Sequence, residues 1–209
     1  MEQFQLLAQP LWVNLLVVIP LVVFFGWRGR SVQISVRQLV FATVFALAFG
    51  FVEAAVVVYL RAAAGLLPGY MGTLAEVQRA GRAAPLGEST VVQFPQSLLT
   101  IEVLREGATM IMLGSIAMLG AARTRERWAI FLWTFAWWDI SYYAGLWATI
   151  RWPASFRNVD VLFLIPVPWI AQVWFPLLVS VLTVVAVGIR QKAHAGASEA
   201  DRALPALES

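Results

Sequence analysis

The sequence predicts an all-α, polytopic integral membrane protein that crosses the bilayer with five helices. Of its 209 residues, 60% are hydrophobic and 13% are charged, whereas a soluble domain carries about 45–50% apolar and about 25% charged residues. In addition, several apolar runs approach the roughly 20 residues that a helix needs to cross a bilayer. This composition excludes an ordinary soluble enzyme and a disordered or collagen-like chain.

Five apolar stretches, separated by polar or proline-containing segments, are expected to be the spans. They lie at about 11–27, 39–60, 99–120, 128–150 and 169–189. The last apolar stretch, residues 161–189, would be roughly 43 Å long as a single helix, which exceeds the ~30 Å hydrocarbon core. Because Pro166 and Pro168 interrupt it, we expect a short interfacial or re-entrant segment over residues 161–168. The fifth helix then follows, and Pro176 can kink it.

The basic residues predict the orientation of the chain. With the N-terminus outside, nine Lys and Arg residues fall in the inner segments and five in the longer outer ones. Cytoplasmic loops carry an excess of Lys and Arg, so we expect an N-out/C-in protein of a bacterial-type cytoplasmic (inner) membrane. Residues 1–192 are then one transmembrane domain with an outer loop at 62–97. The Ala-rich and charged residues 193–209 are expected to form a disordered cytoplasmic tail.

The residue types that are missing from the spans limit the cofactors. The chain has no Cys, and its one His, His194, lies in the tail. Disulfides, Fe–S clusters, zinc fingers and a heme held by paired intramembrane histidines are therefore excluded. We expect no cofactor and no metal ligands, although an oxygen-ligated Mg, Ca or Mn ion is left open. The net charge of +3 is explained by the inner loops, so nucleic acid is not an expected partner.

Ionisable residues inside the expected spans are the main functional signal. They are Glu53, Glu102, Arg105, Glu106 and Asp139. A charge at the centre of a membrane helix costs at least about 2.5–3.5 kcal/mol, so each needs a partner or a purpose. Glu102, Arg105 and Glu106 share one helical face, because they lie at i, i+3 and i+4. Glu53 and Glu106 are expected about 10 Å below the outer boundary, and Asp139 roughly 6 Å deeper. Three helices thus bring carboxylates to a similar depth.

Neighbouring residues complete two candidate sites. Tyr142 and Tyr143 follow Asp139 at i+3 and i+4, so we expect at least one of their hydroxyl groups to reach its carboxylate. Glu53 flanks a ridge of small residues at four-residue spacing, which favours close helix packing: Ala42, Ala46, Gly50 and Ala54. The connection before the last span carries Arg151, Arg157 and Asp160, which form either a lid over the acidic cluster or part of an interfacial connector.

These residues leave three functions open. The first is binding or transport of a cation, a proton or a small polar solute by the cluster Glu53, Glu102, Arg105, Glu106, Asp139, Tyr142 and Tyr143. The alternative is an accessory or structural subunit of a larger membrane complex or a homo-oligomer, in which the Arg–Glu network only fixes the helices in register. The third, less favoured, is an intramembrane enzyme that uses a carboxylate base or an all-oxygen metal site, with no catalytic residue assigned. The lipid bilayer is the partner common to all three.

Overall fold

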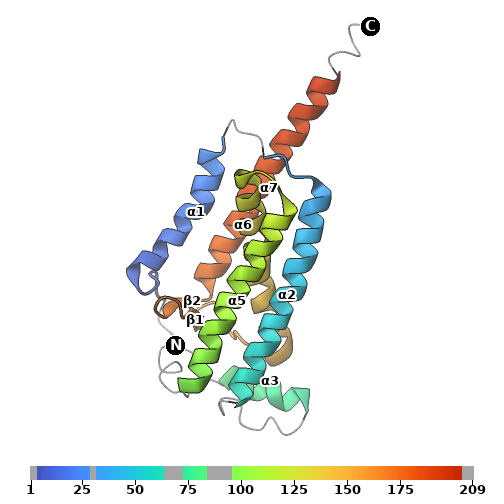
Figure 1. Ribbon diagram of the computed structural model, residues 1–209. Helices are drawn as coiled ribbons and strands as arrows, with labels where there is room; N and C mark the ends of the chain where they lie inside the picture. The colour runs from blue at the N-terminus through green and yellow to red at the C-terminus, as the bar shows by residue number, and fades with distance from the viewer. Residues whose placement is uncertain (1–3, 29–31, 64–72, 84–95, 204–209) are drawn as a thin grey trace.

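The computed structural model describes residues 4–28, 32–63, 73–83 and 96–203 and is mostly helical (Figure 1). The long helices form a bundle, with a small β-hairpin near one end and the C-terminal helix extending beyond the other. In chain order the elements are η1 (Leu11–Val17), α1 (Val18–Leu21), η2 (Val22–Gly26), α2 (Val36–Ala63), α3 (Leu74–Ala83), α5 (Gln96–Gly120), α6 (Thr124–Ile150), β1 (Val159–Phe163), β2 (Trp169–Gln172) and α7 (Trp174–Ala203).

Three helices of the described part are long and apolar enough to cross a membrane, which indicates a membrane protein. They are α2, α5 and the segment Trp174–Gln191 of α7. The apolar helical segment Leu11–Gly26, made of η1, α1 and η2, is shorter. Helix α6 has 27 residues and is therefore about 40 Å long, but its tryptophans, its tyrosines and Asp139 make it less hydrophobic than the other three.

Helix α6 is the centre of the bundle and packs against α2, α5 and α7. Its contact with α2 is unusually close. A Cβ atom added at Gly50 of α2 would lie 2.5 Å from the backbone oxygen of Trp138, and one added at Gly145 of α6 would lie 2.8 Å from the Cβ of Ala54. The small-residue ridge of α2 is therefore a helix-packing surface, as its spacing predicts.

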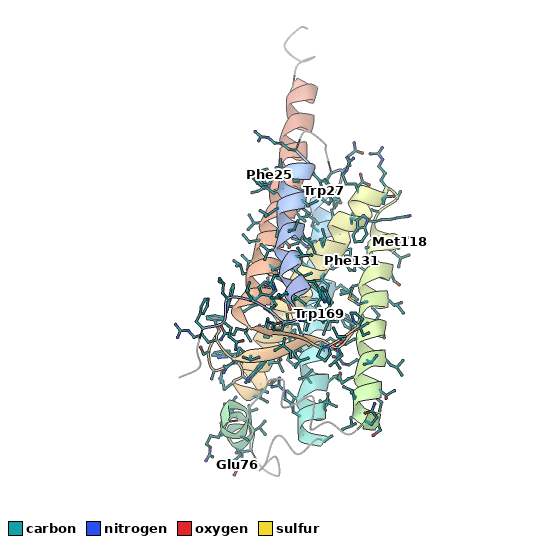
Figure 2. The ribbon with its side chains drawn as sticks, turned by 90° about the vertical axis from the view of Figure 1, so that its left-hand side faces the viewer. Phe25, Trp27, Glu76, Met118, Phe131 and Trp169 are labelled. Atoms are coloured by element: carbon teal, nitrogen blue, oxygen red, sulfur yellow. The ribbon has the colours of Figure 1, made fainter. Side chains whose placement is uncertain are left out.

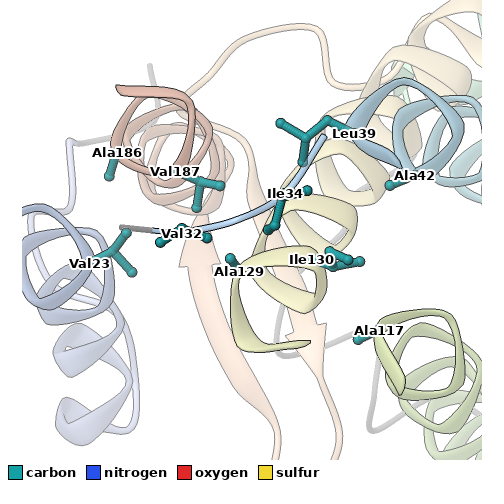
Figure 3. Packing of buried hydrophobic residues seen from close by; sticks show 10 residues of the cluster. All are labelled: Val23, Val32, Ile34, Leu39, Ala42, Ala117, Ala129, Ile130, Ala186 and Val187. Carbon is teal, nitrogen blue, oxygen red and sulfur yellow. The ribbon is translucent and has the colours of Figure 1, made fainter. Parts of the chain in front are cut away.

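A hydrophobic cluster closes the bundle at the end opposite the hairpin (Figure 3). Val32 and Ile34, which precede α2, lie between α7 and α6 and are almost completely buried. The other members come from η2, α2, α5, α6 and α7: Val23, Leu39, Ala42, Ala117, Ala129, Ile130, Ala186 and Val187. The cluster fixes the relative positions of the helices that form the site in the other half of the bundle.

The segment after α6 is a β-hairpin, so the all-α prediction is wrong here: residues 161–168 belong to β1 and to the turn that follows it. Strand β1 pairs antiparallel with β2, and Gln9 adds two further backbone hydrogen bonds to Ile170. Both strands are rich in β-branched and aromatic residues, which favour extended backbone, and Pro166 and Pro168 lie in the turn between them. Pairing satisfies backbone groups that an unpaired segment would leave without partners.

The fifth predicted span and the predicted tail also differ from the structure. Helix α7 begins at Trp174, five residues later than expected, and Pro176 lies in its first turn. There the missing N–H costs no intrahelical hydrogen bond, so a kink is not required. At the other end α7 continues to Ala203, so the structure has helix in residues 193–203, where the sequence predicts the start of a disordered tail. Residues 204–209 lie outside the described part.

The predicted outer loop, residues 62–97, contains the short helix α3. Helix α2 ends at Ala63 and α5 begins at Gln96, whereas residues 64–72 and 84–95 lie outside the described part. A side-chain cap starts α3: Thr73 donates its N–H and its hydroxyl to Glu76 Oε2, at 2.6 and 3.2 Å, and its backbone carbonyl accepts from the Glu76 N–H. The bond from the Thr73 N–H to the Glu76 side chain is one half of a capping box, and it favours helix initiation at Thr73.

The cap makes the stability of α3 dependent on pH. The hydrogen bond from the Thr73 backbone lowers the pKa of Glu76. A carboxyl group with a lowered pKa stabilises the helix above its ordinary pKa, and this contribution is lost as the pH falls through the lowered value. We expect amide hydrogen exchange in α3, corrected for its intrinsic pH dependence, to accelerate in that range, and Glu76→Gln to abolish the change. Identical pH profiles for the two proteins would contradict this.

Candidate functional site

A cavity of about 160 Å³ that contains charged side chains among mostly apolar ones lies between α2, α5, α6, α7 and the β-hairpin. It has room for several water molecules or a small solute. Its charged lining residues are Glu53, Arg61, Glu102, Arg105, Glu106, Asp139 and Asp160, and its aromatic ones are Phe135, Trp138, Tyr142, Tyr143, Phe163 and Trp169. All five ionisable residues predicted from the spans therefore line one cavity, together with both tyrosines and Asp160.

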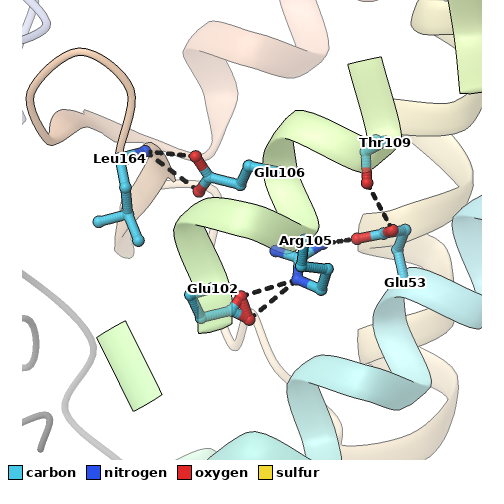
Figure 4. Close-up of polar contacts among 6 residues, drawn as sticks. All are labelled: Glu53, Glu102, Arg105, Glu106, Thr109 and Leu164. Atoms are coloured by element: carbon cyan, nitrogen blue, oxygen red, sulfur yellow. Dashed lines mark hydrogen bonds and ion pairs between the residues drawn. The ribbon is translucent and has the colours of Figure 1, made fainter. Parts of the chain in front are cut away.

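Arg105 joins α5 to α2 on one side of the cavity (Figure 4). Its Nε donates to both carboxylate oxygens of Glu102, one turn earlier on α5, at 2.9 and 2.7 Å. Its Nη1 forms an ion pair with Glu53 of α2. The Thr109 hydroxyl donates to the other oxygen of Glu53 at 2.7 Å. One guanidinium thus holds two buried carboxylates, Glu102 on its own helical face and Glu53 on α2.

Glu106 binds the hairpin instead of a side chain. The backbone N–H of Leu164, at the end of β1, donates to both of its carboxylate oxygens, at 3.1 and 2.8 Å (Figure 4). The carboxylate is buried and ties α5 to the turn of the hairpin. The sequence places Glu106 on the correct face, but its partner is a backbone group of a segment that was not expected to be a hairpin.

The Tyr143 hydroxyl binds a carboxylate other than Asp139, which its spacing suggested. Asp139 accepts a hydrogen bond from the Ser180 hydroxyl of α7 at 2.8 Å, and both residues are buried. The Tyr143 hydroxyl donates to Asp160 of β1 at 2.9 Å. The hairpin, which lies beside α6, thus provides a second carboxylate that the i+4 spacing alone does not reveal.

Arg61, in the last turn of α2, is the second guanidinium at the cavity. It is 4% exposed and stacks on the Trp152 ring, with Cζ 4.4 Å from the ring centroid. Among the described residues it forms no ion pair, and its Nη1 has no hydrogen-bond partner. Burial raises the pKa of Asp160, while the nearby charge of Arg61 and the hydrogen bond from Tyr143 partly offset this rise.

The predicted lid is not assembled as a unit. Asp160 lines the cavity, whereas Arg151 and Arg157 are not among the lining residues. Arg151 ends α6 with φ 56° and stacks on Trp147, 4.3 Å from the ring centroid. Arg157 is exposed in the connection between α6 and β1.

Sequence reasoning did not assign two contributors to the site. It places Arg61 at the outer boundary, because hydropathy ends there, from where the side chain can reach inward. Ser180 was not considered, although it is one of only two hydroxyl residues in the apolar part of α7, the other being Thr183. A hydroxyl group in an otherwise apolar span is the signal that could have identified it.

The arrangement can bind a polar solute by charge and by hydrogen bonds. Within the described residues, no three His, Cys, Asp or Glu side chains come together as ligands of one metal ion. Carboxylates, guanidiniums and indole N–H groups instead surround a space that several elements enclose. No family model, no curated protein and no solved structure matches the chain.

Proposed function

We propose that the cavity binds a small polar solute with a cationic group, and that the protein is a binding or transport protein for this solute. The observation that carries the proposal is the charge of the lining: five carboxylates and two guanidiniums surround the cavity. The aromatic side chains of Trp138 and Tyr142 add faces that attract a cation.

The hydrogen bonds show which of these carboxylates lack a positively charged partner. Glu53 and Glu102 share Arg105, whereas Glu106, Asp139 and Asp160 accept only from neutral donors in the described part of the chain. A network that only fixed helix register would not need these three additional acids, because a buried unpaired charge is costly. In this proposal protons neutralise them in the empty site, and a cationic group replaces a proton when the solute binds. Affinity should therefore fall as the pH is lowered.

The proposed setting is the five-span, N-out/C-in topology in a bacterial cytoplasmic membrane. Figure 2 shows Phe25, Trp27 and Met118 toward one end of the bundle and Glu76 at the other. Five arginines belong to the loops and helix ends of the first of these ends: Arg28, Arg37, Arg123, Arg125 and Arg127. A positive cytoplasmic end supports a cavity in the outer half of the bilayer.

Binding to the purified protein in nanodiscs tests the proposal. The probes are butylamine and 2-methylpropylamine, and intrinsic tryptophan fluorescence or calorimetry reports binding. We expect saturable binding that Asp139→Asn weakens by about 10-fold or more, the loss expected for one charge-assisted hydrogen bond. The matched control is Glu126→Gln, since Glu126 is equally buried on α6 but pairs with Arg123 away from the cavity.

Two results would overturn the proposal. One is a folded protein that binds neither these amines nor any solute that carries an ammonium group. The other is equal binding by wild type and Asp139→Asn. The accessory-subunit interpretation would then be preferred.

A further inference from the structure

Arg61 has a donor for which the described part of the chain provides no acceptor. It lies 96% buried at the cavity, and Trp152 covers the face of its guanidinium. Stacking holds the plane of the group and leaves its edge N–H groups free to bind. Because a buried donor without a partner is unfavourable, Arg61 Nη1, which has no partner among the described residues, is suited to bind an acceptor that enters the cavity.

Two indole N–H groups, on two other elements, are further donors of the same kind. Trp138 of α6 and Trp169 of β2 line the cavity, and their Nε1 atoms have no partner among the residues that the structure describes. An indole N–H can only donate. Donors from α2, α6 and β2 thus line one cavity, each with an atom that has no hydrogen-bond partner among the described residues.

The acidic residues line the same cavity as these donors. Asp139 and Asp160 are close enough to interact electrostatically, and Asp160 interacts in turn with Arg61. Asp139 has a neutral hydroxyl as its partner, and Arg61 forms no ion pair with a described residue. One acid without a cationic partner, Asp139, and one guanidinium without an ion pair among the described residues, Arg61, therefore line the same cavity.

We propose that the solute is a small zwitterion, with its ammonium group against Asp139 and its carboxylate bound by Arg61. This inference rests on the proposed function and adds an anionic half to the solute. Guanidinium groups bind carboxylates through two parallel hydrogen bonds, and the two indoles supply further donors to the same oxygens. A zwitterion adds no net charge, so Glu53, Glu102 and Glu106 keep the partners that they already have.

Matched probes that differ only in their charged groups test this proposal. The first set is valine, 2-methylpropylamine, which lacks the carboxylate, and 3-methylbutanoate, which lacks the ammonium group. The second set separates the charges further: 5-aminopentanoate, butylamine and pentanoate. In at least one set we expect wild type to bind the zwitterion about 10-fold or more tighter than the amine, a gain typical of a charge-assisted hydrogen bond.

The Arg61→Gln variant tests whether Arg61 causes the tighter binding of the zwitterion. We expect it to bind the zwitterion no more tightly than the amine, while its affinity for the amine is retained. Arg61→Lys, which keeps the charge but loses the planar fork, should retain part of the preference. The matched control is Arg151→Gln, because Arg151 also stacks on a tryptophan but does not line the cavity; this variant should behave like wild type.

The outcomes separate the two proposals. If wild type binds amines and zwitterions equally, or if Arg61→Gln keeps the preference for zwitterions, the zwitterion proposal is wrong and the cationic-solute proposal stands. If nothing with an ammonium group binds, both are wrong. Should Arg61→Gln fail to fold, the probe comparison on wild type and the Arg61→Lys variant still decide between these outcomes.

Discussion

Replacement of Arg105 with methionine is expected to lower the free energy of unfolding by about 3–5 kcal/mol, the usual cost of removing one partner from a buried ion pair. Arg105 is the counter-charge of both Glu53 and Glu102, and both carboxylates are more than nine-tenths buried. Without it, two carboxylates lie together in the interior of the bundle. Titration with SDS in mixed micelles, followed by circular dichroism, measures the change.

Removal of the carboxylates should rescue this variant. In the triple variant Arg105→Met, Glu53→Gln, Glu102→Gln no uncompensated charge is left, and buried ion pairs can often be replaced by neutral groups at little cost. We therefore expect the triple variant to recover most of the lost stability. Wild-type stability in the single variant, or a triple variant as unstable as the single one, would show that Arg105 does not stabilise the helices through its charge.

The Arg105 network was largely predictable because it depends on helical periodicity. The spacing of Glu102, Arg105 and Glu106 places them on one face whatever surrounds the helix, and all three line the cavity. Apolar run length likewise predicted the helices α2 and α5 to within about three residues at each end, close to the usual uncertainty of such boundaries. These features follow from local sequence, and the structure confirms them.

The β-hairpin was not predictable in the same way. A short apolar run has no periodicity that distinguishes a strand from a buried helix. Pro166 and Pro168 were therefore interpreted as breaks in a membrane segment and not as a turn between strands. The partners of Glu106 and Tyr143 both belong to this hairpin, so an error in one element changed two contacts of the site. The i+4 spacing brings the Tyr143 hydroxyl within reach of Asp139. It does not decide whether the hydroxyl binds Asp139 or Asp160.

Arg61 shows a different limit of sequence reasoning. A basic residue at the end of an apolar run is normally a topology determinant or an interfacial anchor. Whether it instead turns inward depends on what packs beside it, here Trp152 from the connection after α6. That contact joins residues far apart in the chain, so neither composition nor spacing reports it. The proposed anionic half of the solute site therefore became visible only in the folded molecule.

Enlargement of Gly50 is expected to be the most damaging small change in the helix core. A Cβ atom at this position would lie 2.5 Å from the Trp138 backbone oxygen and 2.7 Å from the Ser141 Cβ. Backbone atoms cannot give way as a flexible side chain can, so α2 and α6 must separate. We expect Gly50→Ala to cost about 1–3 kcal/mol, the range of overpacked cores, and Gly50→Leu to cost more or to prevent folding. The same SDS titration measures both.

Gly107 of α5 is the matched control, since a Cβ atom there meets nothing within 4 Å. Gly107→Ala should be neutral or stabilising by up to about 1 kcal/mol, the difference in helix propensity between Gly and Ala. Gly50 also lies one turn before Glu53, so separation of α2 from α6 moves Glu53 relative to Arg105 and should weaken solute binding as well. If Gly50→Ala unfolds at the same SDS concentration as Gly107→Ala, the close approach of α2 and α6 does not hold the cavity in shape. The lining residues must then be positioned by the hairpin and α7 instead.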